Sequence, residues 1–384
     1  MYLLLLAIIY IAFISLGLPD SLLGSAWPVM VTEFSAPVSY AGIVSAIICS
    51  CTIVSSLLSD RMNRRFGAGL ITAASTLLTA IALAGFSFSR SFFSICLWAI
   101  PFGLGAGAVD AALNNYVALH YKSRHMSWLH CFWGLGATLG PYIMGWAIGA
   151  DHGWRTGYGT VSVIQLSLTA VLFLTLPMWK KRLNDPTTAD RPILGLRGAL
   201  KIPGVKEIMI AFFGYSSLEA TAGLWASTYL VEFRSVDTQT AATFASLFYI
   251  GLTSGRFLSG FVADRIGDKN MIRLSLTIVS VGIVMILIPL PTPVLSLIGL
   301  VIAGLGAAPV YPAIIHSTPA HFGAENSQAI VGIQMASAYT GSTLMPPLFG
   351  LIAQHIHVGL YPVFLILCAA ICLVMTEKVN KLCK

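Results

Sequence analysis

The segment "SGFVADRIGDKN" (Ser259–Asn270) ends a long apolar stretch with an Asp-Arg pair followed by a glycine. A second segment, "SSLLSDRMNRRFG" (Ser55–Gly67), resembles it, and Asp60 and Asp264 lie 204 residues apart. Three more pairs of segments repeat at offsets of 199, 201 and 205 residues. This internal repeat predicts two similar halves, a pattern typical of transporters that bind their solute between repeats.

The other paired segments place polar residues at equivalent positions. "IAFISLGLPDSLLG" (Ile11–Gly24) aligns with "IAFFGYSSLEATAG" (Ile210–Gly223), which sets Asp20 opposite Glu219. The remaining pairs are "FGLGAGAVDAALNN" (Phe102–Asn115) with "AGLGAAPVYPAIIH" (Ala303–His316), and "GATLGP" (Gly136–Pro141) with "GSTLMP" (Gly341–Pro346).

The composition indicates an integral membrane protein. Of 384 residues, 57% are hydrophobic and 10% are charged, and the mean hydropathy is +0.82. A soluble domain has about 25% charged residues. The apolar runs are continuous over roughly 20 residues, the length of a membrane-spanning helix, unlike the short alternating strands of a barrel. The net charge of +7 is not interpreted as a sign of a nucleic-acid partner.

The apolar runs predict an all-α membrane protein with twelve transmembrane helices in two pseudo-symmetric six-helix halves. The predicted spans are 3–31, 38–59, 68–89, 92–119, 128–149, 157–178, 207–232, 239–262, 271–290, 294–320, 327–353 and 359–376. The longest polar break is residues 180–206, which we interpret as a cytoplasmic linker. It separates an N-terminal half (1–179) from a C-terminal half with a short tail (207–384).

Lysine and arginine are distributed unevenly between the two sets of loops. Eighteen of the 22 lie in alternate loops, the linker and the C-terminal tail, and we call this the basic side. The other side has only Arg90, Arg155 and Arg234, while Arg256 lies within the eighth span. The positive-inside rule makes the basic side cytoplasmic. We therefore expect a multi-pass protein of the cytoplasmic membrane, in contact with lipid, with both termini in the cytoplasm.

Three acidic residues, Asp20, Asp110 and Glu219, lie near the middle of predicted spans. A carboxylate inside a bilayer is costly and is a functional candidate by default; the alternative is a carboxyl that only bonds a neighbouring helix. Because desolvation favours the protonated form, at least one of these groups is expected to bind a proton near neutral pH. Such a group can couple proton movement to a solute, and Asp20 and Asp110 are the candidates.

Other polar and aromatic side chains accompany these acids in the predicted spans. Asp110 and Asn114 are four residues apart and so share a helix face. Amides, an imidazole and indole rings suit a sugar, since they can hydrogen-bond its hydroxyls and cover its apolar face. The alternatives are interfacial anchoring for the tryptophans and an interhelical bond for His130. The candidate solute-binding residues are Asn114, His130, Trp133, Glu219, Trp225, Trp27, Tyr311, His316 and Gln334.

The two Asp-Arg loops form a second candidate site. A carboxylate at a helix C-terminus opposes the helix dipole and needs a cation or another helix's N-terminus. Charge pairs there can hold the cytoplasmic side closed and break when it opens, although the arginines also serve the positive-inside rule. The predicted gate residues are Asp60, Arg61, Arg64, Arg65, Asp264 and Arg265.

The glycines indicate helix packing rather than nucleotide binding. "GLGAGA" (Gly103–Ala108) has no preceding strand and continues as a membrane helix, so small residues four apart favour close packing. The packing candidates are Gly103, Gly107, Gly136, Gly140, Gly145 and Gly149. Gly17 and Pro19 are expected to loosen the first helix beside Asp20. No metal-ligand cluster, Walker loop or nucleophile triad stands out, so neither an enzyme nor a cofactor or metal is expected.

Over essentially its whole length the chain resembles the major facilitator superfamily. "GFVADRIGDKN" (Gly260–Asn270) is similar to that family's loop signature, and "GWR" (Gly153–Arg155) before the sixth span is common there. The first copy of the loop departs from the signature, because Ser56 and Asn63 replace its usual glycines. The resemblance implies the twelve-helix fold and, by analogy, a monomer.

Within that superfamily the chain is most similar to the fucose-permease-like branch of sugar:proton symporters. The shared features are an acid in the first span, an acid followed four residues later by Asn in the fourth, and an acid before a Trp in the seventh. Here they are Asp20, then Asp110 with Asn114, then Glu219 with Trp225. His130 stands where that branch has Gln.

The sequence leaves three functions open. The first is secondary active transport of a small polar solute, a sugar, by alternating access coupled to protons, with Na⁺ not distinguished from H⁺. The second is drug or metabolite efflux by the same fold, although three intramembrane acids favour a more polar ligand. The third is a nontransporting membrane sensor, for which no output domain is expected beyond the linker and the tail.

Overall fold

The computed structural model describes residues 2–37, 40–149, 152–180, 194–236, 238–288 and 293–383. Across these ranges the regular structure is helical and no strand occurs. Residues 181–193 of the predicted linker lie outside the described residues. The chain forms two compact units: unit 1 is Met1–Tyr116 with Leu129–Gly195, and unit 2 is Val117–Trp128 with Leu196–Lys384.

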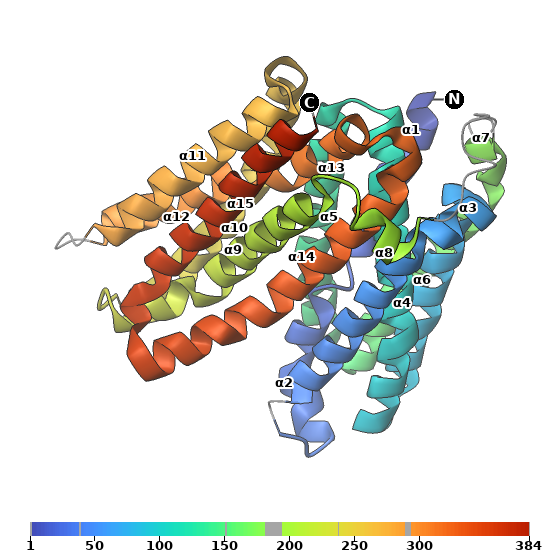
Figure 1. The fold of residues 1–384 in the computed structure, drawn as a ribbon. Helices are drawn as coiled ribbons and strands as arrows, with labels where there is room; N and C mark the ends of the chain where they lie inside the picture. The colour runs from blue at the N-terminus through green and yellow to red at the C-terminus, as the bar shows by residue number, and fades with distance from the viewer. Residues whose placement is uncertain are drawn as a thin grey trace. The chain divides into compact units, whose positions relative to one another are not determined.

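Unit 1 holds the helices of the first half, drawn from blue to green in Figure 1. They are α1 (Tyr2–Gly17), α2 (Leu22–Glu33), α3 (Tyr40–Phe88), α6 (Gly153–Leu174), the short α7 (Leu176–Lys180), and most of α4 (Phe92–His120) and α5 (Ser123–Gly149). The long helix α3 packs along α6.

Unit 2 holds the helices of the second half. They are α8 (Gly195–Ala199), α9 (Val205–Glu232), α10 (Thr238–Ile266), α11 (Asp268–Leu287), α12 (Val294–Ala307), α13 (Val310–Phe322), α14 (Ala324–Ile352) and α15 (Tyr361–Leu382), with a π turn at Ala353–His357 and a 3₁₀ turn at Val358–Leu360 before α15. Helix α9 packs against α14 and α15, and α12 packs against α10 and α11 (Figure 1). The segment Val117–Trp128, which joins α4 to α5, also belongs to this unit.

The described helices account for the twelve predicted spans. Seven of the described helical segments are long and apolar enough to cross a membrane by length and composition. Two of them, Tyr40–Phe88 and Ala324–Leu382, each comprise two predicted spans. The remaining spans are the more polar helices α5, α9 and α10, which carry His130, Glu219 and Arg256.

The first span is broken at the position that Gly17 and Pro19 predict. Helix α1 ends at Gly17 and α2 begins at Leu22, and a turn joins them through hydrogen bonds from Asp20 N to Gly17 O (3.2 Å) and from Leu22 N to Pro19 O (3.1 Å). A proline has no N–H to donate and its ring clashes with the preceding helical turn. Asp20 therefore lies at a break in the helix, and its side chain is exposed.

The two Asp-Arg loops turn at different distances from the aspartate. After Asp264 the helix ends at Ile266, and Gly267 has φ 76° and ψ 152°. After Asp60 the chain stays helical through Asn63 and bends at Gly67, which has φ 78° and ψ 154°. This backbone conformation is almost restricted to glycine. The asparagine in the first copy therefore moves the bend by one helical turn, to the next glycine.

Glycines of α5 allow a close approach to the broken helix. A Cβ on Gly136 would lie 2.0 Å from Ile14 O, and one on Gly140 would lie 2.3 Å from Leu18 O. The predicted packing role is thus confirmed for these two and also for Gly103 and Gly107, where a Cβ would lie 2.3 Å from a backbone oxygen of α3. It is wrong for Gly145 and Gly149, where a Cβ would meet no described neighbour within 4 Å.

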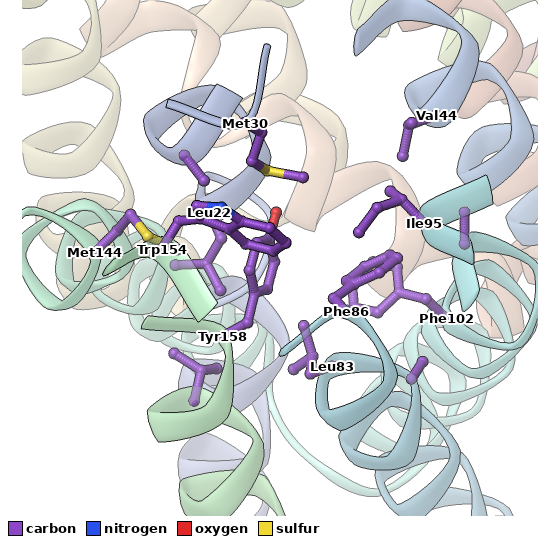
Figure 2. Close-up of a cluster of buried hydrophobic side chains, with 14 of the residues drawn as sticks. Leu22, Met30, Val44, Leu83, Phe86, Ile95, Phe102, Met144, Trp154 and Tyr158 are labelled. Carbon is purple, nitrogen blue, oxygen red and sulfur yellow. The ribbon is translucent and has the colours of Figure 1, made fainter. Parts of the chain in front are cut away.

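A cluster of buried apolar side chains joins five helices of unit 1 (Figure 2). It includes Leu22 and Met30 of α2, Leu83 and Phe86 of α3, Ile95 and Phe102 of α4, Met144 of α5, and Trp154 and Tyr158 of α6. Burying such side chains contributes roughly 1.5–3 kcal/mol each. The cluster therefore fixes the position of α2, the helix that follows the break.

Trp154 of this cluster adjoins an ion pair and a hydrogen bond to the C-terminal end of α3. Arg155 Nη2 lies 2.6 Å from Glu33 Oε1, and Trp154 Nε1 donates to Glu33 Oε2 at 2.7 Å. Arg155 Nη2 also donates to Ser89 O, just after α3, at 2.8 Å, so it neutralises the carbonyl end of that helix. The Arg155 guanidinium and the Trp154 N–H hold the pKa of Glu33 below its usual value.

Arg234 serves unit 2 in the same way. Its Nη2 donates to Ile288 O at 2.7 Å and also to Ile286 O, at the carbonyl end of α11. Two of the three cations on the sparsely charged side thus bind carbonyls at helix C-termini, where a positive charge is favourable.

Candidate functional site

A hydrogen-bonded chain connects α4 and α5 in unit 1. Asn114 Nδ2 donates to Asp110 Oδ1 at 2.7 Å, and Asn114 Oδ1 lies 3.0 Å from His130 Nε2. Since the amide oxygen can only accept, His130 must donate from Nε2. All three side chains are buried: Asp110 and His130 are each 5% exposed, and Asn114 is 0% exposed. The structure thus brings three of the predicted site residues into direct contact.

The second contact in unit 1 joins the helix break to α5. Trp133 Nε1 donates to Asp20 Oδ2 at 2.9 Å. The two backbones lie close together here, since the missing side chain of Gly17 leaves room: a Cβ added to Gly17 would be only 2.1 Å from Trp133 O. Among the described residues Asp20 has no ion pair. Trp133 follows His130 by three residues, so α5 contributes to both contacts.

Trp27 lies apart from these contacts. It is 5% exposed, belongs to the apolar cluster of Figure 2, and stacks edge-on against Phe92 with a centroid distance of 6.3 Å. Its packing role follows from its place on α2, beyond the break and away from Asp20.

Unit 2 contains an ion pair at the position that the repeat aligns with Asp20. Arg256 Nη2 of α10 lies 3.2 Å and 3.3 Å from the two carboxylate oxygens of Glu219 on α9. Tyr215, one turn before Glu219, donates its hydroxyl to Oε2. The sequence analysis noted Arg256 but did not include it in the site. Its place as a cation inside the predicted span 239–262 is the signal that could have found it.

The other predicted residues of unit 2 bond within the helix bundle. Trp225 Nε1 donates to Pro346 O of α14 at 2.9 Å. Tyr311 donates to the Met335 sulfur at 3.1 Å. Gln334 is fully buried, and its Nε2 lies 3.0 Å from Thr318 Oγ1.

His316 lies in a cluster toward the basic end of unit 2. Its Nδ1 lies 2.6 Å from Asp268 Oδ2, and its Nε2 lies 3.0 Å from Tyr121 O. Ser123 donates to the second oxygen of Asp268 at 2.6 Å. A carboxylate and a carbonyl both accept, so both ring nitrogens of His316 must donate and the imidazole carries a positive charge. His316 therefore contacts the α4–α5 connection.

The predicted gate residues follow different patterns in the two units. Asp264 accepts from the backbone N of Arg124 at 3.1 Å and pairs with its Nε at 3.2 Å. Asp60 is buried and pairs with Arg64 at 2.9 Å along one helix. Arg61, Arg65 and Arg265 are exposed, and Arg65 lies over the Phe66 ring at 5.2 Å.

No group of three or more side chains able to hold a metal ion occurs among the described residues. The described sites contain carboxylates, amides, hydroxyls and aromatic rings, together with two basic side chains, Arg256 and His316, that are bonded to carboxylates.

Comparison with known proteins places these sites in a family context. The family model described as Major Facilitator Superfamily matches residues 9–245 and 208–376. Membrane protein MosC of Rhizobium meliloti is 24% identical over 359 residues, covering 90% of this chain and 84% of that protein. Bypass of stop codon protein 6 of Saccharomyces cerevisiae is 25% identical over 288 residues, 68% of this chain. The match spans 57% of the yeast protein, little more than half its length.

Among solved structures, that of the transporter FucP in the outward conformation has a TM-score of 0.81 at 13% identity and covers 98% of both chains. A second FucP structure, of the Escherichia coli fucose:proton symporter, has a TM-score of 0.77 at 14% identity, again over 98% of both chains. At this identity the likeness shows the fold.

Proposed function

Because this chain belongs to the Major Facilitator Superfamily, a family of transporters rather than enzymes, we propose that it moves a small polar solute, a sugar, by proton-coupled alternating access. The observation that carries the proposal is the contact between Asp20 and Trp133 at the break of the first span. An exposed carboxyl at membrane depth can exchange a proton, and an indole beside it offers a flat apolar face for a sugar ring.

Asp20 and Asp110 have different roles in this proposal. Asp20 is exposed and lies at a break, where a small change of backbone can alter its surroundings. Asp110 is 5% exposed and is held by Asn114. A proton carrier must reach water, so Asp20 carries the coupling proton, while Asp110 orients Asn114 and His130 toward the solute.

The cluster at the basic end of unit 2 supplies the gate. Residues Val117–Trp128 pack in unit 2 and bond to Asp264 and Asp268 through Arg124 and Ser123. In this proposal these bonds, with that of His316 to Tyr121 O, close the cytoplasmic side, and they break when the solute is released there. Both termini then lie in the cytoplasm, and the protein acts as a monomer in the cytoplasmic membrane.

Reconstitution into proteoliposomes tests the proposal. Uptake of fucose, xylose and glucose is measured with a pH gradient, with a Na⁺ gradient and with neither. The pH gradient is expected to drive accumulation in the wild type. Asp20→Asn should abolish accumulation and leave solute exchange. Glu377→Gln removes a surface carboxylate that pairs with Arg273 and serves as the matched control. The mechanism is wrong if no sugar responds to the pH gradient, or if Asp20→Asn accumulates like the control.

A further inference from the structure

Glu219, Arg256 and Tyr215 form a hydrogen-bonded group between α9 and α10, two helices that pack together (Figure 1). Arg256 donates to both oxygens of Glu219, and Tyr215 donates to Oε2. We call these three residues the triad.

Glu219 is the most exposed member of the triad. The side chains of Arg256 and Glu219 are 5% and 21% exposed, and Tyr215 is 1% exposed. Arg256 and Tyr215 are therefore buried and orient the carboxylate through their hydrogen bonds, while part of the Glu219 side chain, its accessible edge, remains exposed. A carboxylate has about four acceptor positions, and the hydrogen bonds from Arg256 and Tyr215 occupy three of them. Glu219 can thus accept hydrogen bonds from a solute.

An aromatic side chain stands beside this edge. Tyr249 of α10 is 50% exposed, and its hydroxyl lies 2.0 Å from where a Cβ on Gly223 would be. Gly223 follows Glu219 by four residues and so lies on the same face of α9. The absence of a side chain at Gly223 lets the tyrosine lie directly over α9. A carboxylate next to an exposed ring is suited to a hydroxylated ring compound.

The charge of the triad selects among such compounds. Glu219 and Arg256 cancel, so the subsite has no net charge. A cationic solute would find no uncompensated carboxylate there, and an anionic solute would face the Glu219 edge. We propose that the triad is a subsite for a neutral polyhydroxylated solute, in which Glu219 accepts solute hydroxyls and Arg256 is the positioning residue that sets the charge preference. This inference rests on the proposed function and narrows its substrate class.

Ligand-induced thermal stabilisation of the purified full chain tests the subsite without any ion gradient. The probes are glucose, galactose and mannose, together with the uronate and the 2-amino derivative of each. The wild type should bind at least one neutral sugar about tenfold or more tightly than its two charged derivatives. Glu219→Gln should shift this preference toward the uronate, and Arg256→Met toward the amino sugar, because each leaves one charge uncompensated. A purely structural triad would weaken all three classes equally.

The double variant Glu219→Gln/Arg256→Met keeps the subsite neutral. It tests the subsite even if a single variant does not fold, because replacing both members of a buried ion pair is tolerated far better than removing one. It should bind the neutral sugar about tenfold to a hundredfold more weakly, as expected for the loss of hydrogen bonds to a charged group. Undiminished binding in this variant overturns the proposal.

Three other results also overturn it: no stabilisation of the wild type by any neutral sugar, tighter binding by the wild type of a charged derivative than of its neutral parent, or single variants that lose all classes alike. Preferential binding of a uronate would rule out the neutral subsite but would not contradict proton-coupled transport. Binding of a neutral sugar without uptake driven by a pH gradient would support the subsite and rule out proton-coupled transport.

Discussion

The substitution Gly136→Ala tests the packing that brings Trp133 to Asp20. The added Cβ would lie 2.0 Å from Ile14 O and 3.0 Å from Leu18 N. Both atoms belong to the backbone, so no flexible side chain can move aside. Helix α5 would have to retreat from the broken helix by about 1 Å or more to restore ordinary contact, and overpacking of this kind costs about 1–3 kcal/mol.

Gly145→Ala is the matched control because it makes the same change on the same helix, where the new Cβ would meet no described neighbour within 4 Å. Both substitutions gain the same intrinsic helix preference, up to about 1 kcal/mol. The difference between the two variants therefore isolates the packing cost of about 1–3 kcal/mol. At roughly 2–4 °C per kcal/mol, Gly136→Ala should unfold several degrees below Gly145→Ala.

The assay is thermal unfolding of both purified variants in the same detergent, followed by sugar uptake in proteoliposomes. Gly136→Ala should also lose uptake, since a displaced α5 lengthens the 2.9 Å bond between Trp133 and Asp20. Gly145→Ala should retain it. Unfolding temperatures within a degree of each other would refute the close packing of α5 on the first span.

Three further outcomes follow from the structure. Glu33→Gln should make the unfolding temperature depend less on pH in acid. Arg155 lowers the pKa of Glu33, so the stability that ionised Glu33 contributes is complete above its usual pKa of 4.5 and is lost as the pH falls through the lower pKa of the folded state. Unfolding temperatures measured from pH 3 to 7 test this, and parallel curves for the wild type and the variant would contradict it. Gly67→Ala should lower the free energy of unfolding by about 1–3 kcal/mol, because φ 78° with ψ 154° is nearly restricted to glycine. An unfolding temperature equal to that of the wild type would show that this backbone strain is absent. Asp268→Asn and His316→Gln should each lower stability, and the double variant should be no worse than either alone; additive losses in that double-mutant cycle would mean that the two side chains are not coupled.

Much of the fold could be predicted from the sequence because membrane helices carry their own signals. A bilayer leaves no partner for unpaired backbone groups, so long apolar runs must be helices, and the observed helices follow the predicted spans. The break in the first span was also predictable, since Gly17 and Pro19 act through the local backbone. Four of six glycines were assigned correctly to close packing, whereas spacing alone could not show that Gly145 and Gly149 lack a neighbour.

The candidate site was only partly predictable. Asp110 and Asn114 meet because they are four residues apart on one helix, a relation visible in the sequence. His130 contacts Asn114, and Trp133 contacts Asp20, across different helices. No local sequence rule specifies these contacts. Whether these residues, or those of unit 2, bind a solute stays a prediction.

The sequence by itself determined which residues cross the membrane, where the first helix breaks and which acids lie at membrane depth, because these depend on local hydrophobicity and backbone chemistry. Only the tertiary structure decided the partners of those acids. Asp20 and Glu219 occupy equivalent repeat positions, yet Asp20 accepts from an indole and Glu219 from a guanidinium. The partner comes from a different helix in each case, and packing between helices is set by side-chain shapes far apart in the chain.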